Sequence, residues 1–366
     1  MNRILVAEFL LANADAAQDA APSMLDEAAA MLHGVLEDLA ALPDTDVTVL
    51  LSEDCHLFGT ADCGIRFKIQ RGTLQSDTLP AILRGSSEQS AFDSVLLIAP
   101  ECNGVLVSLL KAVQGSAKSP PLSLNLNWRL AEIFADKRQT DAWLRQHKIP
   151  TIPTKTIDDV TIPLAIDTQH SIADSFAVLK PRDGAGADGV RIVVLGPRSF
   201  QSLPPRQSDN DRWILQPLMP GVACSIGFIG GGERGPTTML PPARQDIQVT
   251  NGNLSYSGGQ VPCDPAIASR IIPVATQLAA ALGAFNGYVG VDLLVDLTDA
   301  DDSNDTVCVV EINPRLCTSY VGYRALTRDN LAAWILQQHV GTPIRWKPGV
   351  VTFNVTGECQ FAAAHQ

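Results

Sequence analysis

Apolar residues in the first third of the chain follow two periods, one typical of buried strands and one typical of helices. Short runs of Val, Ile and Leu predict strands, and longer stretches with apolar residues three or four positions apart predict helices. The strands are expected over 4–9, 46–51 and 94–99, and the helices over 22–42 and 105–113. We interpret this alternation as an open α/β unit. A stretch rich in Ser, Pro and Gly over 115–121 predicts the joint that follows.

The same two periods continue beyond the joint and predict two further units. Helices are expected over 128–147, 266–282 and 329–339, and strands over 175–180, 190–195, 213–217, 224–229, 290–296 and 309–313. The stretches 241–262 and 316–323 are interpreted as loops. The predicted domains are therefore 1–118, 119–215 and 216–366.

Composition narrows the class of protein. The chain is 46% apolar and 18% charged, which favours a folded protein over a disordered one. Its formal net charge of −12 argues against a nucleic-acid partner. No apolar run approaches the ~20 residues that span a bilayer, so no membrane partner is expected. The eight cysteines are scattered without a C-x₂-C pair, and we interpret them as reduced thiols of a cytoplasmic protein.

Two strand-like runs near the C-terminus contain side chains that offer hard oxygen ligands. Asp292 lies in the first run, and Glu311 and Asn313 lie in the second. Side chains alternate along a strand, so Glu311 and Asn313 are expected to share a face. Carboxylate and amide oxygens are the ligands that Mg²⁺ and Mn²⁺ prefer. Arg315 continues the row and can hold a phosphate or carboxylate, so we predict one or two ions and an ATP-using enzyme.

A glycine-rich loop follows the strand that ends at Lys180. Gly184, Gly186 and Gly189 match the dinucleotide fingerprint G-x-G-x-x-G, which binds pyrophosphate only where a strand turns into a helix. Here the loop leads into a β-branched, strand-like run over 190–195. We therefore predict a hairpin whose glycine flap closes over phosphates, with Lys180 reaching the same phosphates. A plain solvated lysine is the alternative for Lys180.

In this order, the motifs resemble the ATP-grasp superfamily of carboxylate–amine ligases. The resemblance covers about residues 120–345 and rests on Asp136-Lys137, on 178–186, on 214–221, on Asp292 and on 311–315. It implies a two-lobed ATP-grasp fold of α/β and α+β class, preceded by an N-terminal α/β pre-ATP-grasp domain. Nucleotide binds between the two lobes in such folds.

The resemblance also implies roles for individual residues. Lys137 and Lys180 would contact the α- and β-phosphates of ATP, and Arg315 would steady the transferred phosphoryl group. Asp292, Glu311 and Asn313 would hold the metal. The hinge that offers backbone groups to adenine would consist of Gln216, Pro217 and Leu218. Many family members carry an acidic residue where this chain has Ala223, so the ribose contact is unassigned.

Shorter motifs over the whole chain resemble the tyramine–L-glutamate ligase-like branch, which is linked to methanofuran-type cofactor synthesis. They include Ala7-Glu8-Phe9, 99–101, 256–259 and 313–322. Candidate substrate contacts are Arg244, Gln245, Thr318 and Ser319. Thr318 and Ser319 have a structural alternative as helix caps, Gln245 as a partner of loop backbone, and Glu8 as a structural residue.

The resemblance implies an ATP-dependent ligase that forms an amide through an acyl phosphate. Its partners would be ATP, a small carboxylate such as an amino acid, and a small amine. A homodimer is one alternative for its oligomeric state. The alternatives are an ATP-grasp small-molecule kinase and a nucleotide-binding regulator without turnover. The six histidines share no metal spacing, and the chain has no G-x-S-x-G elbow for serine chemistry.

Overall fold

The N-terminal part is a parallel sheet with helices on both faces. The computed structural model describes residues 1–56, 67–85, 90–157, 175–184, 189–195, 212–297 and 307–364. The sheet has the order β3-β2-β1-β4-β5. Its strands are β1 (Asn2–Glu8), β2 (Thr45–Leu51), β3 (Lys68–Arg71), β4 (Ser94–Ile98) and β5 (Leu122–Ser123), and its helices are α1 (Ala14–Asp19), α2 (Pro22–Ala40), α3 (Leu79–Arg84) and α4 (Val105–Gln114).

Strand β1 explains why both faces of this sheet are covered. Ile4 and Val6 pack into a core with α2, whereas Leu5 and Ala7 pack into a core with α3 and α4. Alternate residues of a strand point to opposite faces, so an unbroken apolar run needs a helical layer on each side. The α/β unit expected for this part is confirmed, and β5 extends its sheet beyond the predicted joint at 115–121.

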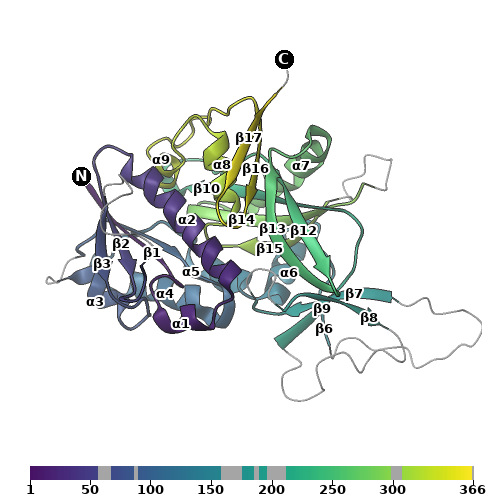
Figure 1. Ribbon diagram of the computed structural model, residues 1–366, viewed down its shortest axis with the longest axis horizontal. Helices are drawn as coiled ribbons and strands as arrows, with labels where there is room; N and C mark the ends of the chain where they lie inside the picture. The colour runs from purple at the N-terminus through teal and green to yellow at the C-terminus, as the bar shows by residue number, and fades with distance from the viewer. Residues whose placement is uncertain are drawn as a thin grey trace, which may run out of the picture.

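The rest of the chain builds a second sheet of 12 strands. One end of this sheet holds β6 (Lys155–Thr156), β7 (Ser175–Pro181), β8 (Arg191–Leu195) and β9 (Trp213–Pro217). These strands follow the helices α5 (Trp128–Phe134) and α6 (Lys137–Gln146) along the chain. Strands β7 and β8 pair antiparallel. The predicted hairpin is therefore confirmed, and a strand-to-helix Rossmann turn is excluded at this place. In Figure 1 these strands lie at the lower right, below the C-terminal strands.

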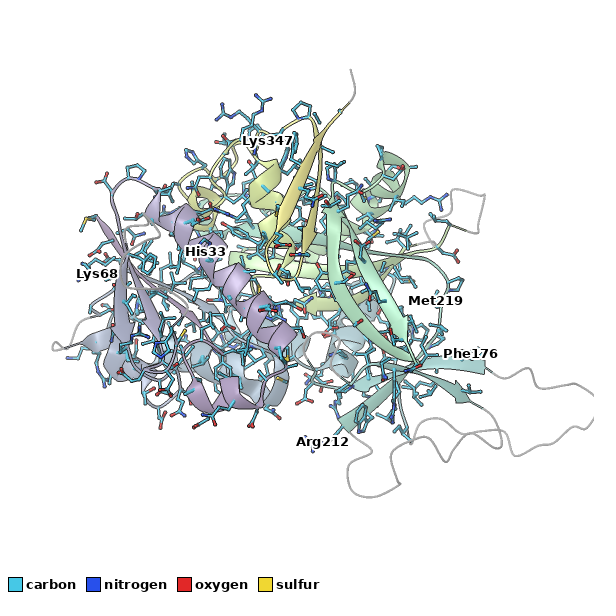
Figure 2. All side chains as sticks on the ribbon, viewed as in Figure 1. His33, Lys68, Phe176, Arg212, Met219 and Lys347 are labelled. Atoms are coloured by element: carbon cyan, nitrogen blue, oxygen red, sulfur yellow. The ribbon has the colours of Figure 1, made fainter. Side chains whose placement is uncertain are left out.

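The C-terminal part contributes the remaining strands and three helices. They are β10 (Val222–Gly231), β11 (Thr238–Met239), β12 (Ala243–Thr250), β13 (Asn253–Val261), α7 (Pro265–Leu282), β14 (Asn286–Val295), β15 (Val307–Asn313), α8 (Ser319–Leu326), α9 (Ala332–Ile335), β16 (Gly349–Asn354) and β17 (Cys359–Ala363). In Figure 1, α2 runs diagonally between this part and the N-terminal sheet. Figure 2 shows Lys68 and Phe176 at opposite ends of the long axis.

Four predictions about elements were wrong. The stretch 316–323, expected as a loop, contains the first turns of α8. The stretch 128–147 forms two helices, because Asp136 leaves the helical conformation and accepts hydrogen bonds as the N-cap of α6. The helix expected over 329–339 is reduced to α9, four residues long. The stretch 241–262, expected as loops, contains the long hairpin β12–β13. The domain boundaries after 118 and 215 stay predictions, although β9 runs across the second.

Helix α7 corrects the expectation that no apolar run is long enough to cross a bilayer. It has 18 residues with a mean hydropathy of 1.3, and so meets the requirement for a membrane span by length and composition. In this fold Ile271, Val274 and Leu278 of α7 pack with β10, β14 and β15 in one core. Buried core helices pass the same composition test, so the finding is weak evidence for a membrane span.

Candidate active site

Strands β14 and β15 bring the three predicted metal ligands together. Asp292 and Glu311 are directly paired across the two strands, beside an irregularity in the register. Asn313 Nδ2 donates a hydrogen bond to Asp292 Oδ2 at 3.1 Å. Two carboxylates and one amide therefore occupy adjacent positions of a single antiparallel pair.

Both predicted phosphate-binding lysines lie next to these carboxylates. Lys137, the first residue of α6, places Nζ 3.0 Å from Glu311 Oε1 and also donates a hydrogen bond to Gly184 O. Lys180, on β7, is buried within electrostatic range of Glu311 and Asp292. Burial lowers the pKa of Lys180 to about 8; repulsion by Lys137 adds to this effect, and attraction by Glu311 opposes it. The ammonium groups of Lys137 and Lys180 thus lie next to the carboxylates of Asp292 and Glu311.

Asp136 fixes the two lysines relative to one another. It caps the N-terminus of α6 through Arg138 N at 2.9 Å, and its Oδ2 lies 2.6 Å from Arg182 Nη2. Lys137 N donates to Arg182 O at 3.0 Å. Burial acts to raise the pKa of Asp136, but hydrogen bonds from Arg182 and Gln139 outweigh it and the pKa is lowered. The ionised carboxylate therefore joins the start of α6 to the end of β7.

The donor set at Asp292 fits a divalent cation. Burial raises the pKa of Asp292 to about 6, and repulsion by Glu311 adds to this; hydrogen bonds from Asn313 and Gln245 oppose it. In the described part of the chain, no three His, Cys, Asp or Glu side chains group closely enough to hold a metal ion. Mg²⁺ in nucleotide sites takes one or two protein carboxylates and completes its shell with phosphate and water, which agrees with two carboxylates and an amide.

Arg315 lies on the turn after β15 and reaches the N-terminal domain. Its Nε is 2.9 Å from Glu101 Oε1, just after β4. A side chain at Gly290 of β14 would collide with the sulfur of Cys317, so glycine there lets this turn pack against the strand. Burial acts to lower the pKa of Arg315, but nearby charges, that of Glu101 first, raise it above its ordinary value. The guanidinium stays charged where the domains meet.

The predicted hinge lies wholly within the described residues, and the predicted flap lies only partly within them. Gln216 is buried, and its Nε2 donates to Thr154 Oγ1 at 2.9 Å. Leu218 N already donates to Phe176 O at 3.1 Å, so this N–H is not available to adenine in the present conformation. Gly184 precedes the residues 185–188 that lie outside the described part, among them Gly186, and Gly189 follows with φ of +70°.

The four predicted substrate contacts divide into two groups. Gln245 Nε2 donates to Asp292 Oδ1 at 2.8 Å, and Thr318 Oγ1 donates to Glu27 Oε2 at 3.0 Å, so both face charged groups of the site. Ser319 is buried against the Tyr288 hydroxyl at 3.3 Å. Arg244 pairs with Asp246 at 3.1 Å and is half exposed. Thr318 makes no side-chain capping bond to α8, so the capping alternative does not apply to it.

The sequence analysis gave Glu27 and Glu101 no role in the site, although 99–101 is one of the motifs shared with the ligase-like branch. Glu101 is buried, and it follows a strand of the parallel sheet. The position of Glu101 after a predicted strand could have indicated a ligand contact, because ligands bind α/β sheets beyond the carboxyl ends of the strands. Glu27 lies on the helix α2 with no signal of its own. Ala223, where many family members carry an acid, lies on β10 opposite Leu294.

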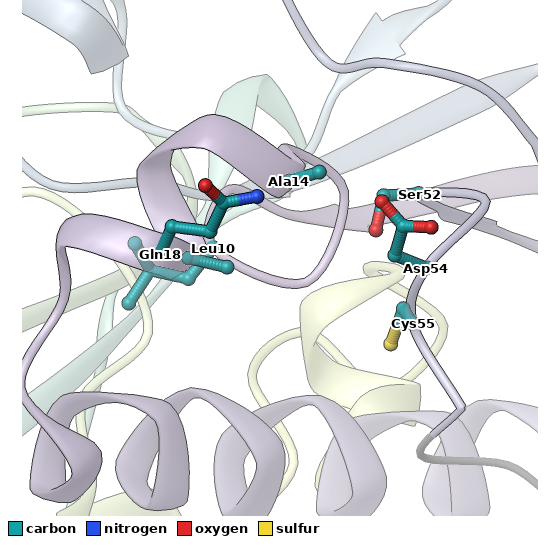
Figure 3. A pocket seen from close by; sticks show the side chains of 7 residues that line it. Leu10, Ala14, Gln18, Ser52, Asp54 and Cys55 are labelled. Carbon is teal, nitrogen blue, oxygen red and sulfur yellow. The ribbon is translucent and has the colours of Figure 1, made fainter.

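A separate hollow of about 220 Å³ opens on the N-terminal domain (Figure 3). Leu10, Ala14 and Gln18 line one side of it, and Ser52, Asp54 and Cys55 the other. None of the lysines, carboxylates or arginines described above lines this hollow. We therefore keep it apart from the candidate site.

Known proteins resemble this chain in sequence. Two curated relatives are named tyramine–L-glutamate ligase. The one from Methanocaldococcus fervens is 23% identical over 245 residues, 67% of this chain and 65% of its own length. The one from Methanocaldococcus jannaschii is 25% identical over 38% of this chain and 40% of its own length. The chain thus spans less than two thirds of the length of either relative.

Solved structures match over 96% of the chain. A structure described as an ATP-grasp superfamily protein from Archaeoglobus fulgidus has a TM-score of 0.65 at 19% identity and is covered over 92%. N5-carboxyaminoimidazole ribonucleotide synthetase from Thermotoga maritima has a TM-score of 0.61 at 15% identity and is covered over 80%. A family model described as an ATP-grasp domain matches residues 134–319, which is 186 of the 366 residues. The chain therefore belongs to the ATP-grasp family, and its fold is that of the family.

Proposed function

We propose that this protein is an ATP-dependent ligase that joins a carboxylate to an amine through an acyl phosphate. The observation that carries the proposal is the convergence of Lys137 and Lys180 on Asp292 and Glu311. Two buried cations suit the phosphates of ATP, and paired carboxylates suit the metal that accompanies them. Membership of the ATP-grasp family supports the same activity.

The reaction requires two successive nucleophilic substitutions, the first at phosphorus and the second at the acyl carbon. A carboxylate oxygen of the substrate attacks the γ-phosphorus of ATP, the bond to the β-phosphate oxygen breaks, and ADP leaves. The amine nitrogen then attacks the acyl carbon, phosphate leaves with the bonding electrons, and the nitrogen loses a proton to give the amide. Oxide is a poor leaving group and phosphate a good one, which is why the first step is needed.

The residues of this chain act mainly through position and charge. Lys137 and Lys180 bind phosphate oxygens, and Arg315 stabilises the negative charge of the transferred group. Asp292, Glu311 and Asn313 are the residues that would hold Mg²⁺ or Mn²⁺. Such an ion supplies charge neutralisation on the phosphates. The loop at 183–189, part of which lies outside the described residues, would exclude water from the acyl phosphate.

L-Glutamate and tyramine are the substrates that we propose to test first. The names of the two curated relatives support this pair. Wild-type protein with MgATP and both compounds should release ADP, and mass spectrometry should detect their amide. ADP with a phosphorylated product and no amide, over a screen of amino acids and aryl-ethylamines, would instead establish a kinase.

Replacement of one metal-binding carboxylate tests the site itself. Glu311→Gln should lower kcat about a hundredfold, because the barrier rises by several kcal/mol when a phosphoryl-transfer cation is lost. Glu132→Gln, an exposed position on α5, is the matched control and should leave kcat unchanged. A folded Glu311→Gln protein within a few-fold of wild type would contradict the proposed site.

A further inference from the structure

Three glutamates form an acidic cluster where the N-terminal sheet meets the C-terminal part. Glu8 ends β1, Glu101 follows β4, and Glu27 lies on α2. The two strands are neighbours, and the sheet order runs outward from them in opposite directions, to β2 and β3 on one side and to β5 on the other. This reversal is the switch point at which open α/β sheets bind ligands. The acidic cluster therefore occupies a favoured ligand position.

The cluster carries more negative than positive charge. Arg315 is the basic side chain that acts electrostatically on all three glutamates. Three carboxyl groups thus surround this one guanidinium. Lys137 and Lys180 do not remove this excess, because they face Asp292 and Glu311. A positively charged ligand would neutralise the remaining negative charge of the acidic cluster.

Glu101 provides an independent sign of a missing partner. The residue is 3% exposed, and both of its carboxylate oxygens are buried without a hydrogen bond. Arg315 Nε lies 2.9 Å from Oε1 in an ion pair, which leaves Oε2 without a partner among the described residues. Buried carboxylates nearly always accept hydrogen bonds, because leaving them without any is costly. A donor group from a ligand would supply what Glu101 lacks.

The spacing favours an organic cation over a metal ion. In the part of the chain that the structure describes, no three acidic, cysteine or histidine side chains form a group that could hold a metal. An ammonium nitrogen keeps its carboxylate partners at about 2.8 Å, farther than the roughly 2.0–2.6 Å of a metal ion and its oxygen ligands, so it suits a looser arrangement of the three glutamates. Tyr256 of β13, partly buried, lies within electrostatic range of Glu27 and Asp292 and offers an aromatic surface for the carbon chain of such a ligand.

We propose that Glu8, Glu27 and Glu101 bind the primary ammonium group of a substrate of the ligase. This inference rests on the proposed function, since it assigns the cationic end of one substrate to the domain interface beside Arg315. Thr318 positions Glu27 through its 3.0 Å hydrogen bond. The ammonium group belongs either to the attacking amine or to an amino acid that supplies the carboxylate, and the experiment separates these sources.

The test compares charged probes with uncharged analogues by calorimetry on the full chain. Tyramine is paired with 4-ethylphenol, and L-glutamate with glutarate, so each pair differs mainly in the amino group. Wild-type protein should bind one charged probe more tightly than its analogue. Glu101→Gln should weaken that probe about tenfold, the value of one charge-assisted hydrogen bond, and leave its analogue unchanged. Glu132→Gln should match wild type.

Glu27→Gln keeps the test decisive if Glu101→Gln does not fold, because Glu27 is only partly buried and glutamine still accepts from Thr318. Loss of tyramine binding alone assigns the cluster to the amine, and loss of L-glutamate binding alone assigns it to the amino acid. Equal binding of charged and uncharged probes, or unchanged binding in both variants, would overturn the inference. Binding is measured without turnover, so an absence of ADP release would sink the proposed function without deciding this result.

Discussion

At the scale of single residues, the candidate site depends on burying lysine charge beside carboxylates. Lys180 is 4% exposed, and its ammonium is stabilised mainly by Glu311 and Asp292. A buried charge is retained only when it is paired, because desolvation otherwise favours the neutral form. ATP brings further negative charge to the same place, so bound nucleotide should gain strongly from this lysine.

Lys180→Met should therefore weaken MgATP binding about tenfold or more, as expected for the loss of a charge-assisted contact. Methionine keeps the length and apolar character of the side chain, so the fold should persist. Isothermal titration with MgATP measures the change, and Lys155→Met, on an exposed position of β6, is the control. Equal affinity in Lys180→Met and wild type would remove Lys180 from the nucleotide site.

Glu8 gives the protein a pH-dependent stability. Burial raises its pKa from 4.5 to about 7, although hydrogen bonds from Leu11 and neighbouring backbone and the charge of Arg315 oppose the shift. The folded state therefore binds this proton more tightly than the unfolded state does. The resulting stability is fully present below pH 4.5 and is lost as the pH rises through 7.

Urea unfolding at pH 5 and at pH 8 tests this effect in Glu8→Gln. The free energy of unfolding of wild type should fall relative to the variant by about 2.5 kcal/mol between the two conditions. Glutamine cannot ionise, so the variant lacks this contribution. Parallel pH dependence in the two proteins would mean that Glu8 titrates normally.

Sequence could predict the ligands of the site better than their surroundings. Asp292, Glu311 and Asn313 stand in strand-like runs, and the alternation of strand side chains brings such residues together. Glu101 needed knowledge of which strands become neighbours at the switch point. The hydrogen bond from Gln245 to Asp292 was not foreseen, because strand β12 was not recognised. The role of Gln245 as a substrate contact stays a prediction.

At the scale of elements, local pattern decided which predictions succeeded. The strands β7, β8 and β9 have long apolar or β-branched runs and appear close to the predicted places. The hairpin β12–β13 was missed because Arg244, Gln245 and Asp246 interrupt the apolar pattern. The sequence did carry a signal for its turn, because Asn-Gly is the dipeptide that tight hairpin turns favour. In the structure Asn251 and Gly252 have the positive φ angles of such a turn, 51° and 80°.

The start of α6 is the element on which the lysine arrangement depends. Asp136→Ala removes both the N-cap and the partner of Arg182, whereas Asp136→Asn keeps a capping oxygen. Unfolding in urea should show a loss of about 1–2 kcal/mol for Asp136→Ala and a smaller loss for Asp136→Asn. If both variants lose the same stability, the cap contributes little and the ion pair with Arg182 dominates.

At the scale of the whole molecule, the N-terminal domain and the C-terminal part share one core. Leu32 and Leu36 of α2 belong to the same buried cluster as Tyr320 and Tyr323 of α8. This cluster could not be inferred from sequence, because the residues lie nearly 300 positions apart. It includes Leu316, next to Arg315, so the position of Arg315 beside the acidic cluster depends on how the two parts dock.

Polar contacts at the edge of this core make the docking testable. Asp38 of α2 accepts from the Tyr320 hydroxyl at 2.6 Å and from Arg324 Nη2 at 3.0 Å, and Arg324 also lies 2.7 Å from Glu37. Arg324→Met leaves two partly buried carboxylates without their cation. Because an unpaired group of this kind costs about 1–3 kcal/mol, the midpoint of urea unfolding should fall.

The shared core also predicts how the protein unfolds. Circular dichroism follows helices throughout the chain. Fluorescence follows Trp334 and Trp346 in variants with the other tryptophans replaced. The two probes should give coincident urea transitions, because one cluster joins the two parts. Arg324→Met should shift both curves together. Arg345→Met, at an exposed ion pair with Asp329, is the control and should shift neither by more than a few tenths of a kcal/mol. Two separate transitions would mean that the domains fold independently and that the interface holding Arg315 near Glu101 can open.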